Sequence, residues 1–328
     1  MKRREFITLL GGAALAWPRP AYAQQDGHVA RVGVMTPSLD RPGMRYAYPS
    51  FLAELRKLGF VEGRNVLIQH RRTDQAAPQV LAAVNELVAW KAEVLLVWGG
   101  EFALQAVIAT RPAVPIVVGA INFDPVAKGY VQSLARPGGN VTGVIARQLD
   151  LAPKLIDLLQ EAFPGRNRVG ILWDAQSADQ FGAAEREAQA RRLALRSLKL
   201  DNPPYDFAAA FRTLAQDNVQ MALALSSPLF SRQGANMAAL AVEHRLPVMF
   251  TLKHYVEAGG LMSYGVDFGP LMRRATSLVA KILRGAKPAE LPVEQAVQFE
   301  FVVNLKTAKA MGIALPTSIL LRADEVIE

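Results

Sequence analysis

The sequence contains no cysteine among its 328 residues. Disulfide bonds, thiolate metal sites and thiol nucleophiles are therefore excluded, and so is the lipid-modified cysteine that would anchor an exported protein to a membrane. Histidine is scarce as well: the four histidines, His28, His70, His244 and His254, form no HExxH pair and show no other metal-like spacing. The composition thus predicts neither a metal site nor a cofactor.

Long apolar runs are missing too, apart from one near the N-terminus. A basic start at residues 2–4 precedes an apolar run at 6–17, and the small residues Ala21 and Ala23 follow. The run is too short to cross a bilayer, which needs about 20 apolar residues, so residues 1–23 are predicted to be a secretory signal peptide. The twin arginine of the basic start favours the twin-arginine export route. The remaining chain is expected free in the periplasm.

Clustered basic charge is a further absence. The formal net charge is +8, and the excess of three positive charges in the signal peptide leaves +5 for the remaining chain. The arginine pairs at 71–72, 191–192 and 273–274 are scattered and do not form a stripe with aromatic residues between them. A solvated surface of mixed charge is expected, with no nucleic acid as partner.

The chain instead has a regular alternation of short apolar strands and amphipathic helices. Strands are predicted at 31–35, 66–70, 93–98, 114–120 and up to Ile145, and again at 168–173, 195–200, 219–225 and 247–250, with helices between them. Such alternation indicates parallel sheets with helices on both faces. Because the pattern starts afresh after Ile145, the fold class is α/β with two Rossmann-like lobes.

The stretch from Val114 to Ile145 is the centre of this organisation. It begins with a continuously apolar run, which is typical of a strand covered on both faces. Asp124 followed by Pro125 is a typical helix start, and Pro137 with the two glycines after it is a typical stop. Apolar residues at 126, 130 and 134 recur at helical spacing, so an amphipathic helix is expected between Asp124 and Pro137.

The run DPVAKGYVQSLARPGGNVTG at 124–143 resembles the signature of bacterial ABC transporter substrate-binding proteins, whose better understood members bind tryptophan or tyrosine. The runs FLAELRKLGFVEGRNVLIQHR at 51–71 and ILRGAKPAELPVEQAVQFEFVVNLKTAKAMGIALP at 282–316, with the final ADEVIE, agree with it. The resemblance implies a type I periplasmic binding protein, a monomer whose lobes are joined by a three-strand hinge.

The resemblance also implies a division of the chain and a set of partners. Lobe 1 would comprise residues 29–146 plus about 262–292, and lobe 2 would comprise residues 147–261 plus about 293–328. The implied partners are a small-molecule solute and the ABC permease and ATPase subunits at the inner membrane. The implied function is capture of the solute between the lobes by hinge closure, without catalysis.

Ligands of open parallel sheets bind beyond the carboxyl ends of the strands, so residues that follow strands are the site candidates. They are Thr36, Ser38, Trp98, Gly99, Asn122, Phe123, Asp124, Trp173, Asp174, Ser177, Ser226, Ser227, Tyr264 and Asp267. Several are aromatic, as is Phe230, and would stack on a flat ligand such as an aromatic amino acid. The alternative for each aromatic residue is a place in the core at the sheet edge.

A zwitterionic ligand needs acceptors for its ammonium group and donors for its carboxylate. Asp124, Asp174 and Glu101 are candidates for the ammonium, although Asp124 equally suits a purely structural helix cap. The serines and the amides of helix N-termini are candidates for the carboxylate.

Other functions find less support in the sequence. The run Ser263-Tyr264-Gly265 lacks the leading glycine of a nucleophile elbow, because Leu261 stands there. The run Trp98-Gly99-Gly100 lacks the lysine of a phosphate loop. A periplasmic protein that presents its ligand to a membrane receptor, instead of a transporter, stays open as an alternative.

Overall fold

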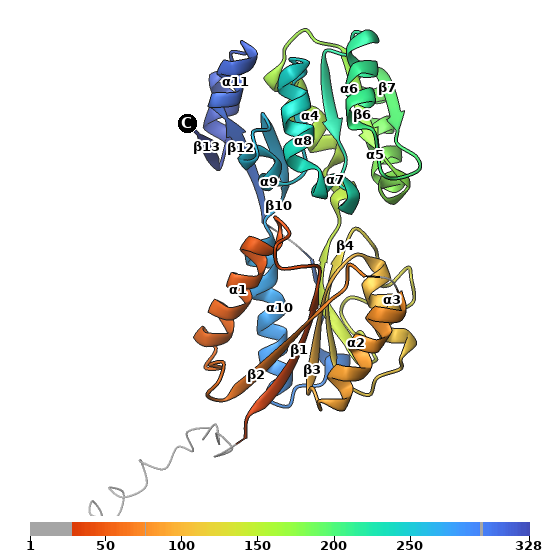
Figure 1. The fold of residues 1–328 in the computed structure, drawn as a ribbon, viewed down its shortest axis with the longest axis vertical. Helices are drawn as coiled ribbons and strands as arrows, with labels where there is room; N and C mark the ends of the chain where they lie inside the picture. Colours follow the sequence, from red (N-terminus) through yellow and green to blue (C-terminus); the bar gives the residue numbers. More distant parts are fainter. Residues whose placement is uncertain (1–27, 76, 296–297) are drawn as a thin grey trace, which may run out of the picture.

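The computed structural model describes residues 28–75, 77–295 and 298–328. These residues form two α/β lobes that follow one another along the long axis of the molecule, each built on its own sheet (Figure 1). The prediction of two α/β lobes is confirmed.

The sheet of lobe 1 has six strands in the order β11-β5-β4-β3-β1-β2, and every pair in it is parallel. The strands are β1 (Ala30–Thr36), β2 (Val66–Arg72), β3 (Val94–Gly99), β4 (Ile116–Ile121), β5 (Val141–Ala146) and β11 (Glu294–Gln295). The helices of this lobe are α1 (Met44–Lys57), α2 (Ala77–Ala89), α3 (Glu101–Ala109) and α10 (Phe268–Leu283). The order 2-1-3-4-5 is that of a doubly wound fold, which binds ligands beyond the carboxyl ends of its strands.

Lobe 2 contains a seven-stranded sheet in the order β13-β12-β10-β9-β8-β6-β7. Its strands are β6 (Arg168–Trp173), β7 (Ala194–Lys199), β8 (Met221–Ala224), β9 (Val248–Phe250), β10 (Met262–Val266), β12 (Phe299–Asn304) and β13 (Glu325–Ile327). Its helices are η1 (Gln148–Leu151), α4 (Ala152–Ala162), η2 (Ala175–Ser177), α5 (Ala178–Ala190), α6 (Phe207–Gln216), α7 (Pro228–Arg232), α8 (Gly234–Glu243), α9 (Lys253–Glu257), α11 (Leu305–Met311) and α12 (Thr317–Arg322). One pair departs from the expected parallel pattern, because β12 runs antiparallel to β10.

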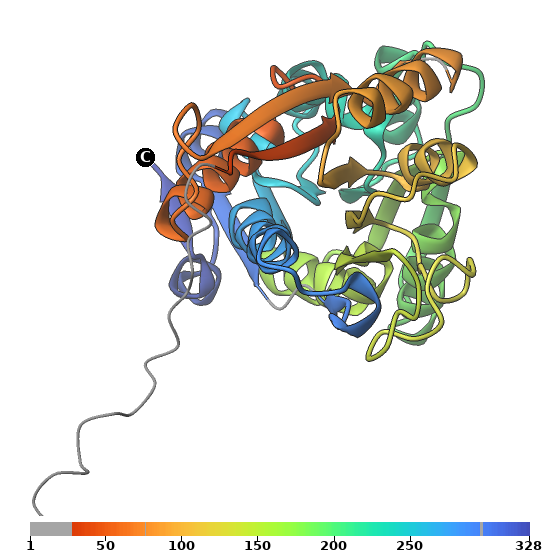
Figure 2. The ribbon, with the colours of Figure 1, turned by 90° about the horizontal axis from the view of Figure 1, so that it is seen from below.

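The core of lobe 1 lies on both faces of its sheet. Apolar residues of α1 and α10 cover one face, and those of α2 and α3 cover the other. Figure 2 shows α10 beside α1, although the two helices come from opposite ends of the sequence. Because both faces are covered, β3 and β4 read as continuous apolar runs with no polar alternation.

The chain passes between the two sheets three times. It leaves lobe 1 after β5, returns between β10 and α10, and crosses back between β11 and β12. The predicted limits near 262 and 292 fall close to these crossings, yet β10 pairs in the sheet of lobe 2 and β11 pairs with β5 in lobe 1. As domain limits they stay predictions.

The prediction of a helix between Asp124 and Pro137 is wrong. Asp124 does begin a turn, since its Oδ1 accepts hydrogen bonds from the amides of Val126 and Ala127 at 2.9 and 3.1 Å. The turn stops at Gly129, whose φ of +74° is incompatible with a right-handed helix. The segment from there to β5 is irregular, and its apolar side chains pack on lobe 1 as a loop.

Candidate ligand-binding site

A cleft of about 410 Å³ lies between the lobes, within the size range of small-molecule sites. Lobe 1 supplies residues at the ends of β1 to β4 and the start of α3; they are Pro37, Arg41, Gly43, Met44, Asp74, Trp98, Gly99, Gly100, Glu101, Phe102, Ile121, Asn122 and Phe123. Lobe 2 supplies residues around η2, α7 and the end of β9; they are Gln176, Ser226, Ser227, Pro228, Ser231, Arg232 and Leu252. Phe268, at the start of α10, completes the lining beside the hinge.

Aromatic side chains form one part of the wall. The Trp98 ring is nearly buried and meets the Phe268 ring edge to face, with centroids 5.9 Å apart. Gly119 leaves room for this ring, because a Cβ there would lie 2.2 Å from it. Phe102 is 46% exposed, which is unusual for so large an apolar side chain. This wall offers apolar ring surface to a flat ligand.

Polar side chains of both lobes meet at the floor of the cleft. The Asn122 amide donates from Nδ2 to Oγ of Ser226 at 3.3 Å, which links the end of β4 to the end of β8. The buried Gln180 fixes Ser226 through its backbone, donating to the carbonyl at 3.0 Å and accepting from the amide at 3.1 Å. The position of Ser226 is therefore set before any ligand arrives.

Asp174 lies directly behind this floor and is fully buried. Its carboxylate accepts hydrogen bonds from the hydroxyls of Ser227, Tyr205 and Ser177 and from the amide of Gln176. Burial, together with the Asp174 charge, raises the pKa of Tyr205 to about 12, so Tyr205 keeps its proton for this bond. Asp174 is committed to holding the wall and is closed off from a ligand ammonium group.

Charged side chains line the outer part of the cleft. The Asp74 carboxylate pairs with Arg41 at 2.6 Å and with Arg72 at 2.9 Å. Burial alone raises the pKa of Asp74, but the hydrogen bonds from the two guanidinium groups outweigh burial and hold that pKa well below its usual range. Arg232 faces this pair from α7 in lobe 2.

Glu101 is the second carboxylate on the wall. It pairs with Lys128 at 3.0 Å, and it accepts hydrogen bonds from the Tyr130 hydroxyl and the Gln105 amide. Burial acts to raise its pKa, but these bonds outweigh burial and lower it. Both carboxylates of the cleft are therefore ionised and already engaged.

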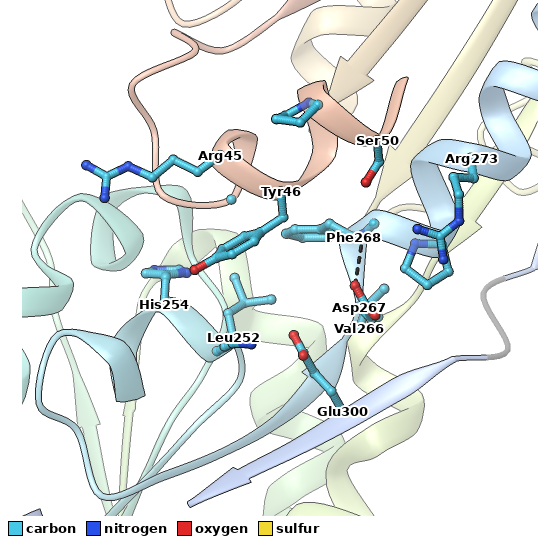
Figure 3. A pocket seen from close by; sticks show the side chains of 15 residues that line it. Arg45, Tyr46, Ser50, Leu252, His254, Val266, Asp267, Phe268, Arg273 and Glu300 are labelled. Carbon is cyan, nitrogen blue, oxygen red and sulfur yellow. Dashed lines mark hydrogen bonds between the residues drawn. The ribbon is translucent and has the colours of Figure 1, made fainter. Parts of the chain in front are cut away.

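A second pocket, of about 420 Å³, lies beside the hinge (Figure 3). Tyr46 points from α1 toward lobe 2, where its hydroxyl donates to the Glu257 carboxylate. Asp267 is the N-cap of α10 and accepts from the amide of Gly269 at 2.9 Å. Glu300, at the start of β12, faces this pocket without a hydrogen bond recorded among the described residues. Charged and polar side chains of both lobes line this pocket, next to the crossing between β10 and α10 and the start of β12.

The structure brings six of the predicted site residues together in the cleft: Trp98, Gly99, Asn122, Phe123, Ser226 and Ser227. Asp267 lines the hinge pocket instead. The other seven line neither pocket, and in each case a local bond or contact explains why.

Four of these seven are polar residues engaged close to their own strand ends. Thr36 is buried and bonds His70 at 2.8 Å, and Ser38 donates to Asp40. Ser177 closes a capping box with Asp174, so both serve the start of η2.

The remaining three follow the same pattern. Asp124 caps its own turn and pairs with Arg147 at 3.3 Å. Trp173 stacks on Phe181 with centroids 4.3 Å apart, and Tyr264 packs beside Phe299. The aromatic Phe230, also considered, is fully buried in the lobe 2 core.

The cleft residues that the sequence analysis missed include Arg41, Asp74, Phe102, Arg232 and Phe268. Asp74 lies two residues beyond β2 and Phe102 three beyond β3, so the strand-end rule would have found both with a wider window. Arg41 lies in a loop before α1, and Phe268 follows a strand that belongs to the other lobe. Arg232 gives no signal in the sequence, because it reaches the cleft from the end of α7.

Two doubly wound lobes, a hinge of three crossings and a cleft lined by both lobes define the type I periplasmic binding protein fold. The chain belongs to the ABC transporter substrate binding protein family, whose model matches residues 31–327. It is a binding protein and not an enzyme, as predicted. In the described residues, no helix is long and apolar enough to span a membrane.

Known relatives agree with this assignment. A tyrosine-binding protein of Clostridioides difficile (strain R20291) is 22% identical over 284 residues, which cover 83% of this chain and 78% of that protein. The structure of an ABC domain from Streptococcus pneumonia in complex with L-Trp has a TM-score of 0.80 at 22% identity and covers 91% of this chain and all of that one. A ligand-free, open substrate-binding protein with adhesive properties from Clostridium difficile has a TM-score of 0.71 at 20% identity, covering 91% and 99%.

Proposed function

We propose that this protein is the periplasmic solute-binding component of an ABC importer and that its solute is an aromatic amino acid or a similar flat molecule. The observation that carries the ligand class is the aromatic wall of the cleft, where Trp98 and Phe268 pack edge to face and Phe102 also lines the cavity. Relatives that bind tyrosine and L-Trp support the same class.

The binding residues in this proposal come from both lobes. Trp98, Phe102 and Phe123 offer ring surface, while Gly99, Asn122, Ser226 and Ser227 offer polar groups. A ligand that contacts both lobes stabilises the closed form, so binding shifts the population toward the form that the permease recognises. The signal peptide and the absence of cysteine favour a protein that is exported, by the twin-arginine route, and free in the periplasm.

The test uses the mature protein from Gln24, purified without denaturation. Native mass spectrometry identifies any retained small molecule, and thermal shift with the twenty amino acids and a set of aromatic acids ranks the candidates. A retained aromatic solute that raises the melting temperature supports the proposal. A retained sugar or other non-flat solute, or no shift across the whole panel, contradicts the ligand class.

A pair of variants then places the solute in the cleft. Phe102→Ala removes an exposed ring from the aromatic wall, and Leu321→Ala removes an apolar side chain that is 82% exposed on α12, away from the cleft. Losing one stacking contact is expected to weaken binding by about 3-fold to 10-fold. Leu321→Ala should bind like the unmodified protein. Equal affinities in both variants would remove Phe102 from the site.

A further inference from the structure

Within the proposed class of flat aromatic solutes, the charges of the cleft favour an acid over a zwitterionic amino acid. Arg232 ends α7 and lines the cleft from lobe 2, and among the described residues no carboxylate lies within 4 Å of its guanidinium group. Burial, followed by repulsion from Arg41 and Arg72, lowers the pKa of Arg232, whereas Asp74 acts in the opposite sense. Arg232 therefore sits in a region of net positive potential.

The lobe 1 side of the cleft also carries more positive than negative charge. Arg41 and Arg72 share the single carboxylate of Asp74, at 2.6 and 2.9 Å. The Asp74 side chain is only 7% exposed, whereas that of Arg41 is 25% exposed. A solute in the cleft would thus contact the guanidinium groups of Arg232 from lobe 2 and Arg41 from lobe 1. It would contact little of the nearly buried Asp74 carboxylate.

In the part of the cleft that the structure describes, no carboxylate is free to accept an ammonium group. Asp74 is taken by two arginines, and Glu101 is taken by Lys128, Tyr130 and Gln105. Asp174 lies behind Ser227 and is fully buried. Placing a cation here would require breaking an existing ion pair or leaving the cation without a charged partner.

We propose that the solute is an aromatic carboxylic acid without an α-ammonium group, and that Arg232 and Arg41 bind its carboxylate from opposite lobes. This inference rests on the proposed function, since it assigns the chemistry of the same cleft. A guanidinium group suits this role because its planar donors match the two oxygens of a carboxylate. The anion would then bridge the lobes and favour closure.

Four compounds that share an indole ring with a short side chain distinguish recognition of a carboxylate from recognition of an ammonium group. They are indole-3-propionate, L-tryptophan, tryptamine and indole-3-propionamide. The first lacks the ammonium group of tryptophan, the second carries both charges, the third lacks the carboxylate, and the fourth is neutral. Titration calorimetry on the mature protein is expected to find indole-3-propionate bound at least about 10-fold tighter than the other three, the gain expected of one charge-assisted hydrogen bond. The corresponding set of 4-hydroxyphenyl compounds, with tyrosine in place of tryptophan, covers the smaller ring.

Arg232→Met tests the residue itself, and Arg212→Met is the control. Arg212 is an exposed arginine on α6 of the same lobe and lies outside the cleft. Arg232→Met is expected to weaken binding of the propionate about 10-fold to 100-fold and to leave the amide unchanged, with partial rescue in Arg232→Lys. Arg212→Met should leave both unchanged.

Each other outcome overturns the inference. If tryptophan or tyrosine binds as tightly as its acid, the cleft accepts an ammonium group, and the proposed function stands while this inference fails. If Arg232→Met weakens binding of the acid and of the amide equally, Arg232 stabilises the closed form through Asp74 and does not bind the carboxylate of the solute. If no compound of either set binds, the aromatic ligand class fails as well.

Discussion

Glu300 in the hinge pocket makes stability depend on pH in a direction opposite to that of most carboxylates. Burial raises its pKa first, and repulsion from Asp267, Glu325 and Glu257 adds to this, whereas Lys253 opposes it; the resulting pKa is about 7. In the unfolded chain the same carboxyl has a pKa of 4.5. Between these values the folded protein holds a proton that the unfolded chain has lost, so the free energy of unfolding falls as the pH rises.

The magnitude follows from the size of the shift. Each pKa unit corresponds to about 1.4 kcal/mol, so the shift from 4.5 to about 7 would correspond to about 3 kcal/mol in the absence of solvent screening. Glu300 is only partly buried, and solvent screens part of the repulsion, which reduces the expected effect to about 1–2 kcal/mol. This amount is a substantial part of the stability of a typical domain.

Glu300→Gln removes the titrating group and keeps the shape of the side chain. Urea unfolding, followed by tryptophan fluorescence at pH 5 and pH 8, gives the free energy of unfolding for both proteins. The stability of Glu300→Gln relative to the unmodified protein should rise by about 1–2 kcal/mol between these pH values. Glu243→Gln, at the exposed end of α8, should show no such change. A relative stability of Glu300→Gln that does not vary with pH would refute the reasoning.

Three further variants test other parts of the structure. Gly265→Ala places a Cβ 1.8 Å from the backbone oxygen of Thr251, which cannot move aside, so the yield of folded protein should fall sharply. A variant with a normal melting curve would show that the two backbones are not this close. Asp174→Ala removes the buried acceptor of three hydroxyls and should cost about 3 kcal/mol in thermal unfolding; a cost below about 1 kcal/mol would mean that water replaces the carboxylate. Tyr46→Phe removes an exposed hydrogen bond between α1 and α9, worth about 0.5–1 kcal/mol, and should therefore raise the fraction of open molecules. Small-angle scattering should then show a larger radius of gyration, and an unchanged radius would refute the prediction.

Most of the fold could be predicted because the strands are buried on both faces and the helices carry clear apolar stripes. β6 begins and ends where the pattern places it, at 168–173. The failure at 124–137 has a physical cause: the spacing of apolar residues was helical, but Gly129 takes a positive φ and the side chains pack from a loop. Spacing alone does not reveal a backbone reversal.

The site was harder to predict than the fold. The strand-end rule selected Trp98, Asn122 and Ser226, which line the cleft, because each lies at or just after the carboxyl end of a strand in the sheet of its own lobe. The same rule also selected Trp173 and Tyr264, which face local partners, since it gives the end of the strand and not the direction of the side chain. Arg232 depends on how two lobes face each other, which no local pattern contains.

The position of α10 has a consequence for how the protein reaches its native state. This helix comes from the last fifth of the chain, yet it packs on α1 and covers one face of the lobe 1 sheet. Lobe 1 therefore keeps apolar surface exposed until nearly all of the chain has left the ribosome, and its closing contacts span most of the sequence. Lobe 2 strands β6 to β9 need no such late partner, so the lobe that is second along the chain is placed to complete its central sheet first.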